Sequence, residues 1–246
     1  MINKRVIGQA SRLGKIVDHR ETYGRHIIKK ITQKIKPASC LDVGAGKGAD
    51  LSIVKKYSAN CELNALDFRL KNQNLIDLGA NIFKIDLEKE ELPFEDNSLD
   101  FIIANQVLEH VKEIYWINHE VFKKLKIGGY FLIGVPNLLA LHNRILSLIG
   151  IHPTCMKMIS AHIRGYSIKD TSIFYNTIGG EFLKIEKIYG SQFYPLPRKL
   201  SRVANYFFPS LSTSIFFLIR KIDKYDGQFI SWIEDNVLET SFYKGY

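Results

Sequence analysis

Short apolar runs alternate with longer segments whose apolar positions recur at helical spacing along most of the chain. Apolar runs of four to eight residues indicate strands, and apolar residues at i, i+3 and i+4 indicate amphipathic helices. Regular alternation of the two predicts an α/β fold. Strands are expected over residues 40–43, 61–66, 81–85, 99–104, 130–135, 182–189 and 214–220, with helices over 21–36, 70–78, 114–126, 138–149 and 167–178 and another beginning near 51.

This pattern divides the chain into three regions. Residues 1–36 are predicted to be a basic helical arm, residues 37–222 the α/β domain, and residues 223–246 a helical tail. In the tail, Phe229, Ile230, Ile233 and Val237 predict a helix that docks on the domain or on a second subunit.

Two segments depart from simple amphipathic patterning. Residues 138–149 are apolar around most of a helical circumference, which favours a buried helix over an apolar surface. Residues 190–212 contain five aromatic residues among three prolines and are predicted to be a long irregular loop. Such loops usually carry function or move.

Composition bears on the cellular compartment of the protein. The chain is 46% hydrophobic and 24% charged, with no apolar run near the roughly 20 residues that span a bilayer. The first residues lack a continuous apolar signal segment, and the three cysteines form no C-x-x-C pair, so we expect a cytoplasmic protein with reduced thiols.

The positive charge is concentrated at the start of the chain. The net charge is +9, and residues 1–36 hold ten Lys and Arg against two acids. A basic arm of this kind favours an anionic partner, such as nucleic acid, a phosphorylated carrier or a membrane face. A solvated basic helix without a partner explains the charge equally well.

A glycine-rich turn follows the first predicted strand, in the sequence S-C-L-D-V-G-A-G-K-G-A-D of residues 39–50. Gly44, Gly46 and Gly48, with Ala45 between the first two, let the backbone lie directly against a ligand at a helix N-terminus. The turn also fits the G-x-G-x-x-G/A pattern of dinucleotide sites, with Asp67 at the distance of a ribose acid. Asp42 distinguishes a dinucleotide from a cationic ligand, because an acid at the strand tip repels a pyrophosphate and suits a cationic amine.

These residues resemble motif I of the class I S-adenosylmethionine (SAM)-dependent methyltransferases, and the resemblance covers about residues 37–222. The family implies a seven-stranded Rossmann-like sheet in the order 3-2-1-4-5-7-6, with strand 7 antiparallel and helices on both faces. Asp67 matches its motif II, and L-P-F-E-D-N-S-L-D at 92–100 resembles its small-molecule members. The resemblance implies cofactor binding by Asp42, Gly44, Ala45, Gly46, Gly48, Asp67, Phe68, Asp86, Leu87 and Asn105, with Tyr23 and Arg25 as further candidates.

The segment V-L-E-H-V at 107–111 resembles the signature that follows strand 4 in this group. It makes His110 a candidate base, although Glu109 and His110 could equally stabilise the start of a helix. V-P-N at 135–137 and H-I-R-G-Y-S at 162–167 resemble a subset in which a loop closes over the acceptor, which makes His162 the second candidate catalytic residue.

No metal is expected from the sequence. Some quinone-biosynthesis relatives bind a divalent metal through acids in the V-L-E-H-V segment, but Gln106 stands where one such acid is needed. His152, Cys155 and His162 are unevenly spaced, and nothing completes a tetrahedral set.

The function expected is methyl transfer from SAM to a small molecule or a glycan or lipid-linked saccharide. An RNA methyltransferase, favoured by the basic arm, and a non-catalytic SAM-binding subunit are the alternatives. We expect a monomer or homodimer with peripheral contact to a membrane.

Overall fold

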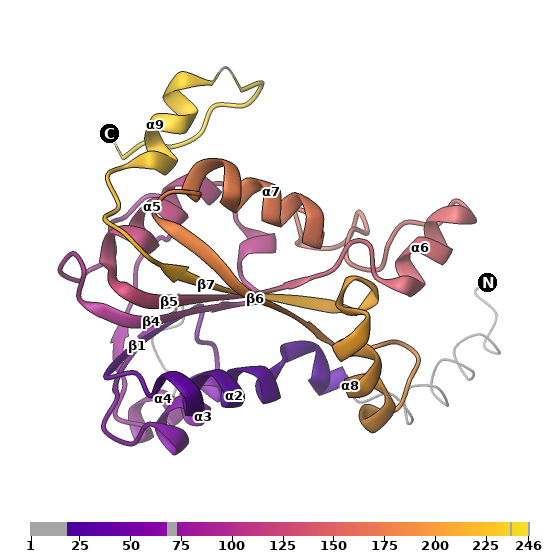
Figure 1. The fold of residues 1–246 in the computed structure, drawn as a ribbon, viewed down its shortest axis with the longest axis horizontal. Helices are drawn as coiled ribbons and strands as arrows, with labels where there is room; N and C mark the ends of the chain where they lie inside the picture. Colours follow the sequence, from indigo (N-terminus) through magenta and orange to yellow (C-terminus); the bar gives the residue numbers. More distant parts are fainter. Residues whose placement is uncertain (1–18, 68–72, 237, 246) are drawn as a thin grey trace.

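The computed structural model describes residues 19–67, 73–236 and 238–245. A seven-stranded sheet in the order β3-β2-β1-β4-β5-β7-β6 runs through the middle of the molecule (Figure 1). Only β7 runs antiparallel to its neighbours in this sheet, so the predicted strand order and direction are confirmed. The strands are β1 (Ser39–Val43), β2 (Glu62–Leu66), β3 (Asn81–Phe83), β4 (Leu99–Asn105), β5 (Leu125–Pro136), β6 (Leu183–Ser191) and β7 (Ser214–Lys221).

Helices cover both faces of the sheet. On one face lie α2 (Arg25–Ile35), α3 (Ala49–Tyr57) and α4 (Gln73–Asp77), and on the other lie α5 (Ile114–Lys124), α7 (Ile168–Gly179) and α9 (Gln228–Asp235) (Figure 1). Each face has its own apolar cluster, because strands buried on both sides need a helix layer against each. The strands of the sheet centre, such as β1, are accordingly buried at every position.

One edge of the sheet gathers the loops that matter for function. The parallel strands β1 to β5 end at this edge, and β6 ends there too because both β5 and β6 pair antiparallel to β7. In an open α/β sheet, ligands bind outside the carboxyl ends of the strands. Two further helices, α6 (Leu141–Leu148) and α8 (Arg198–Phe207), follow β5 and β6 at this end (Figure 1).

The prediction of a buried helix over 138–149 is wrong. Helix α6 is shorter, and Asn143 is its one buried residue, whereas Ile145 and Leu148 are 54% and 86% exposed. Asn137 does not cap this helix; its amide donates to the carbonyls of Ser210 and Ser212. The apolar residues of α6 therefore form a surface.

The prediction of an irregular 190–212 segment is also wrong. Helix α8 occupies Arg198–Phe207 and a 3-10 turn occupies Pro209–Leu211. Arg202 forms a two-point ion pair with Glu21, which fixes α8 against the 3-10 helix η1 (His19–Tyr23). The aromatic and proline content had masked the helical spacing of the apolar residues in α8.

Local contacts hold α7 and α9 in place. Ser167 caps α7 by accepting from the backbone N–H of Asp170 at 3.1 Å. In α9, Phe229 and Ile233 are buried against α5 and α7, so the tail docks on its own domain. Val237 and residues 1–18 of the basic arm lie outside the described residues. Among the residues described, no helix has both the length and the apolar content to cross a membrane.

Candidate active site

The glycine turn after β1 packs against the end of β2 and forms part of the wall of a cavity. Gly44 has φ +71°, and a Cβ there would lie 2.7 Å from Val107, so only glycine fits. Gly48 is equally constrained by Leu75, whereas a Cβ at Gly46 would have 3.9 Å to its nearest neighbour. Ala45 holds the turn against β2 through a 2.9 Å hydrogen bond from its N–H to the carbonyl of Leu66.

The cavity has a volume of about 890 Å³ at the carboxyl edge of the sheet. This size suits a small-molecule ligand. Its walls come from the glycine turn, the end of β2, the loop after β3 and the η2 turn (Leu108–His110). Of the predicted site residues, the cavity is lined by Gly44, Gly46, Asp67, Asp86, Leu87 and His110, with Lys47, Leu66, Gln73, Asn74, Ile85, Glu88 and Val111 completing the wall.

Asp86 lies in a structured turn at the cavity wall. Its carboxylate accepts from the N–H of Glu88 at 3.0 Å and lies 3.6 Å from the ammonium of Lys89. The predicted strand 3 stops at Phe83, so Ile85 to Leu87 reach the cavity as loop residues. Loop backbone can present its own donors beside the acid.

Asp42 and Asp50 form an acidic pair behind the glycine turn. Burial raises the pKa of Asp42 well above its usual range, and the nearby carboxylates of Asp50 and Asp67 raise it further. Burial also raises the pKa of Asp50, against the opposing effects of Asn105 and Arg25. Asp50 was missed by sequence reasoning, although its place in the first turn of α3, directly after the third glycine, was a usable signal.

Asn105 connects three elements at this site. Its side-chain amide donates to Asp50 at 2.7 Å and to the carbonyl of Tyr23 at 3.0 Å. Its Oδ1 is buried without a hydrogen-bond partner among the described residues. Arg25 lies 3.6 Å from Asp50, so the N-terminal helix reaches the predicted cofactor region as expected, through Asp50 rather than through the cavity lining.

The structure brings the two candidate catalytic histidines together. The rings of His110 and His162 meet edge to face at 4.7 Å, although 51 residues of chain separate them. Glu109 lies beside them with its Oε1 3.9 Å from His110 Nε2. Burial raises the pKa of Glu109 to about 7 and lowers that of His162.

Several predicted cofactor residues do not line the cavity. Asp42, Ala45 and Gly48 support the turn from behind, and Asn105 lies beside them. Phe68 lies outside the described residues. The roles of the candidate site residues stay predictions.

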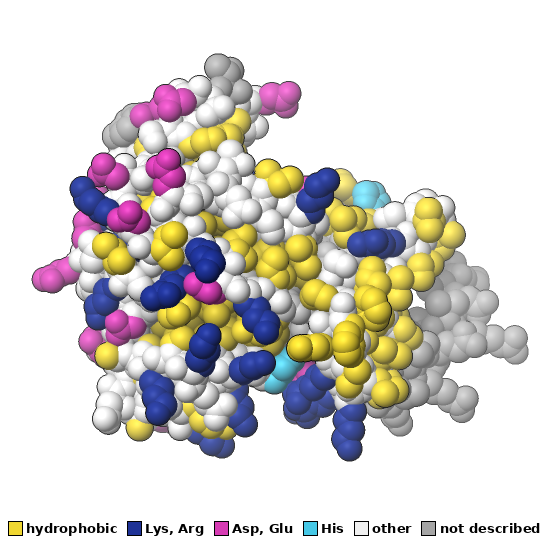
Figure 2. Space-filling view, in the orientation of Figure 1, with side chains coloured by type: hydrophobic (Ala, Val, Ile, Leu, Met, Phe, Trp, Pro, Cys, Tyr) yellow, Lys and Arg dark blue, Asp and Glu magenta, His cyan; other side chains and the backbone are white. Residues whose placement is uncertain are grey.

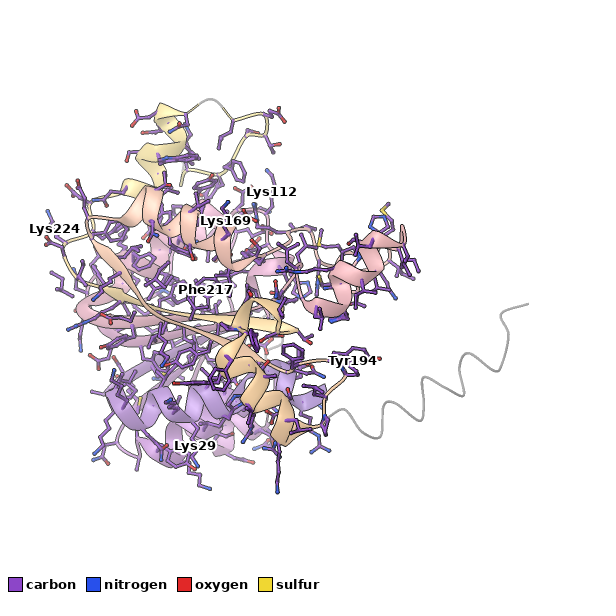
Figure 3. The ribbon with its side chains drawn as sticks, turned by 45° about the vertical axis from the view of Figure 1, so that its right-hand side comes forward. Lys29, Lys112, Lys169, Tyr194, Phe217 and Lys224 are labelled. Atoms are coloured by element: carbon purple, nitrogen blue, oxygen red, sulfur yellow. The ribbon has the colours of Figure 1, made fainter. Side chains whose placement is uncertain are left out.

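A second cavity of about 720 Å³ lies at the same sheet edge, beside η1, whose Thr22 is part of its wall. Tyr194 stands between α6 and α8 at this cavity (Figure 3). Most of its walls are apolar, and it is lined by Thr22, Leu141, His142, Ile145, Leu146, Thr154, Gln192, Tyr194, Pro195 and Thr213.

The strand order, the glycine turn and the acids at the strand ends define a class I SAM-dependent methyltransferase domain. A family model described as "Methyltransferase domain" matches residues 41–133. This match and the fold together support a SAM-dependent methyltransferase domain, with SAM as its cofactor.

Two curated proteins are similar in sequence to part of the chain. It is 30% identical over 105 residues to sterol 24-C-methyltransferase erg6 of Schizosaccharomyces pombe, covering 39% of this chain and 28% of that protein. It is 30% identical over 129 residues to demethylmenaquinone methyltransferase of Staphylococcus haemolyticus, covering 48% of this chain and 52% of that protein. The chain thus spans about half or less of the length of these curated relatives.

A solved structure shares the fold across most of the chain. The 1,6-didemethyltoxoflavin-N1-methyltransferase of Burkholderia thailandensis, with bound 1,6-didemethyltoxoflavin and S-adenosylhomocysteine, superposes with a TM-score of 0.55 and 13% identity. The match covers 84% of this chain and 80% of that one. At 13% identity, this match shows a shared fold and no more.

Proposed function

We propose that this protein transfers a methyl group from SAM to an amphipathic small molecule or lipid-linked saccharide. The observation that carries the cofactor assignment is the set of acids around the glycine turn, with Asp67 and Asp86 in the cavity wall and Asp42 behind it. SAM carries two cationic centres and hydrogen-bond donors on its ribose and adenine. Carboxylates suit these groups and would repel a pyrophosphate.

Each acid has a separate task in this proposal. Asp67 accepts from the ribose hydroxyls, since a carboxylate has lone pairs for both. Asp86 and the backbone of Leu87 recognise the adenine. Asp42 and Asp50 favour a cationic amino-acid moiety near the glycine turn, which in turn relieves the cost of burying them. Bound SAM supplies an electrophilic methyl group, and the chain supplies orientation and exclusion of water.

The second cavity is the proposed acceptor site. It lies at the same sheet edge as the cofactor cavity, with η1 in its wall. Its apolar lining suits an acyl, isoprenoid or ring portion of an acceptor, while Thr154, Gln192 and Thr213 offer polar contacts. His110 and His162 are the proposed catalytic residues; His110 lines the cofactor cavity and His162 lies against its ring, so both are near the proposed methyl donor.

Two helices near this cavity bury small polar residues and expose most of their large apolar ones. Helix α8 buries Ser201 and Asn205 and exposes Leu200, Val203 and Phe207 at 58%, 58% and 66%. Helix α6 shows the same inversion, and apolar side chains gather over both in the space-filling view (Figure 2). Exposed lysines on α2 and α8, such as Lys30 and Lys199, add positive charge.

An apolar face beside basic residues fits the interface of an anionic membrane. In this proposal, a lipid-linked acceptor enters the second cavity from the membrane along this face. RNA remains the alternative acceptor favoured by the basic arm, and a non-catalytic SAM-binding subunit is the alternative without turnover.

Incubation with methyl-labelled SAM and fractionated cell extract tests the function. We expect label in a lipid or lipid-linked glycan fraction, and none with an Asp67→Ala variant at the same SAM concentration. An Asp223→Ala variant, altered at an exposed acid after β7, is the matched control and should label normally. Label in RNA would identify the alternative acceptor, and no label in any fraction despite SAM binding would identify a binding subunit.

A further inference from the structure

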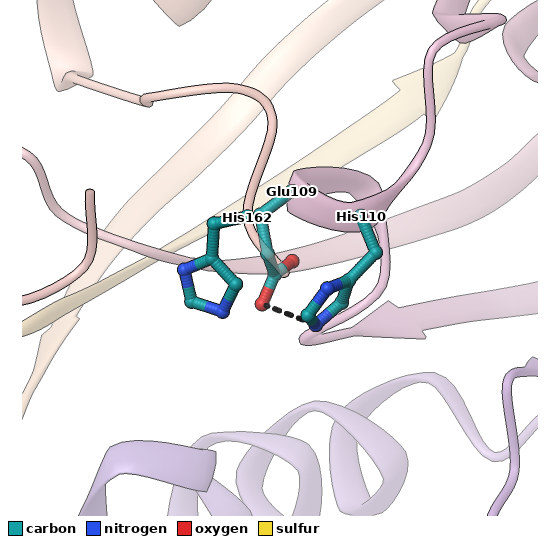
Figure 4. Close-up of side chains that lie close together, drawn as sticks. All are labelled: Glu109, His110 and His162. Atoms are coloured by element: carbon teal, nitrogen blue, oxygen red, sulfur yellow. Dashed lines mark ion pairs between the residues drawn. The ribbon is translucent and has the colours of Figure 1, made fainter. Parts of the chain in front are cut away.

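Three side chains able to bind a metal converge beside the cofactor cavity. Glu109 and His110 belong to the η2 turn after β4, and His162 comes from the loop between α6 and α7. The backbone fixes this meeting, since the N–H of Ile163 donates to the carbonyl of Glu109 at 2.8 Å. One ligand atom from each residue lies within 4.8 Å of the other two (Figure 4).

Hydrogen bonds determine which nitrogen of each histidine is available. His110 Nδ1 lies 3.2 Å from the carbonyl of Ala161, and His162 Nδ1 lies 2.8 Å from the carbonyl of Cys155. A carbonyl only accepts, so Nδ1 carries the proton in both rings. Each neutral ring therefore has its lone pair on Nε2, as metal-binding histidines do when a backbone carbonyl orients them.

The carboxyl group of Glu109 accepts no hydrogen bond from the described residues. Its side chain is 1% exposed, and neither carboxylate oxygen has a hydrogen-bond partner among the described residues. Burying such a group alone is costly, and a paired or metal-bound carboxylate avoids this cost. Two imidazole lone pairs and a carboxyl group converge here with no hydrogen-bond donor from the described residues pointing between them, which is an arrangement that suits a cation.

We propose that Glu109, His110 and His162 bind one divalent transition-metal ion of the Zn²⁺ type. Two histidines and one carboxylate are a known ligand set for a catalytic zinc with an open fourth position. Ligand atoms around tetrahedral zinc lie about 3.4 Å apart, so atoms that now lie up to 4.8 Å apart need to approach by up to about 1.4 Å. His110 can make this movement because its side chain is 41% exposed.

This site reverses the expectation of no metal. Gln106 does stand where some relatives have a metal-binding acid, but His162 supplies a third ligand from another loop. Cys155 contributes its carbonyl to orient His162 rather than its thiol. Because His110 also lines the cofactor cavity, the proposed metal site borders that cavity. Metal binding at these residues does not depend on methyl transfer.

Metal titration of the chelator-stripped full chain tests the site. We expect one equivalent of Zn²⁺ to bind in competition with a chromophoric chelator, and Co²⁺ to give the visible absorption of a four- or five-coordinate site. His162→Gln should weaken Zn²⁺ binding at least about 100-fold and abolish the Co²⁺ absorption. His152→Gln alters an exposed histidine of the same loop and is the matched control, which should bind Zn²⁺ as wild type does.

Circular dichroism and SAM calorimetry accompany each variant, so that loss of folding or of the cofactor site is distinguished from loss of the metal. Glu109→Gln removes the charge without changing the shape and should also lose Zn²⁺. Unchanged Zn²⁺ affinity in folded His162→Gln and Glu109→Gln variants, or far less than one equivalent in wild type, would overturn the proposal.

Discussion

Asp67 is the residue on which cofactor affinity should depend most simply. It lies at the end of β2 in the cavity wall, away from the apolar core. In the proposed function it accepts two ribose hydroxyls, and hydrogen bonds to a charged group contribute about 1.5–3 kcal/mol. Its removal therefore affects binding without disturbing the packing of the sheet.

We expect Asp67→Ala to weaken SAM binding by about 1.5–3 kcal/mol in calorimetry, with an unchanged melting temperature. Asp223→Ala should bind SAM with wild-type affinity. Equal affinities in a folded Asp67→Ala protein would remove this residue from the site.

His119 provides a pH test at the residue scale. Burial and the positive charge of Lys123 lower its pKa from 6.5 to about 4, while its ring lies 2.8 Å from the hydroxyl of Tyr225. Between pH 6.5 and 4 the unfolded chain binds a proton that the folded protein does not. Stability from this group is therefore complete above pH 6.5 and falls as the pH is lowered, by about 3 kcal/mol in all.

Urea denaturation at pH 7 and pH 4.5 measures this effect. His119→Gln should lose about 2–3 kcal/mol less stability than wild type between the two pH values. His152→Gln, at an exposed histidine, should follow wild type. Identical pH dependence in wild type and His119→Gln would contradict the assignment.

Among the elements, the β1–α3 turn was predictable from three alternating glycines, whereas the exposure of α6 and the existence of α8 were not predicted. Apolar content in 138–149 was interpreted as burial, because sequence periodicity cannot tell an inward face from an outward one. In α8 the buried residues Ser201 and Asn205 are polar, since they bond to the backbone of Phe193 and to Ser212. Such tertiary contacts leave no periodic signal.

Gly44 tests the turn. Gly44→Ala should lower the free energy of unfolding by about 1–2 kcal/mol for the left-handed backbone, plus a further cost for contact with Val107 at 2.7 Å. Gly79→Ala is the matched control, since Gly79 has φ +70° and nothing within 4 Å of its added Cβ. Equal losses in urea denaturation would show that contact with Val107 is unimportant.

The outward apolar face of α8 tests membrane contact. Phe207 and Phe208 are 66% and 58% exposed, and we expect a Phe207→Ser/Phe208→Ser variant to lose co-sedimentation with anionic vesicles. The binding of wild type should weaken as salt is raised.

Ile173→Ser, at a 53% exposed position on α7 across the sheet, is the control and should bind vesicles like wild type. Tight binding to a mixed-sequence RNA without vesicle binding would instead favour the RNA acceptor.

At the scale of the whole molecule, the sheet order was predictable because the glycine turn and the acids after strands 1 to 3 match one family pattern over most of the chain. The meeting of Glu109 and His110 with His162 was not, since it depends on how the 150–165 loop folds back onto η2. The second cavity was likewise not predicted, because it depends on how α6 and the loops after β5 and β6 pack together.

Calorimetric titration of the wild-type chain with SAM, S-adenosylhomocysteine and NAD tests the central assignment most directly. The acids around the glycine turn predict that both sulfur nucleotides bind with one site per chain and that NAD gives no binding heat. Binding of NAD, with no heat from either sulfur nucleotide, would contradict the account.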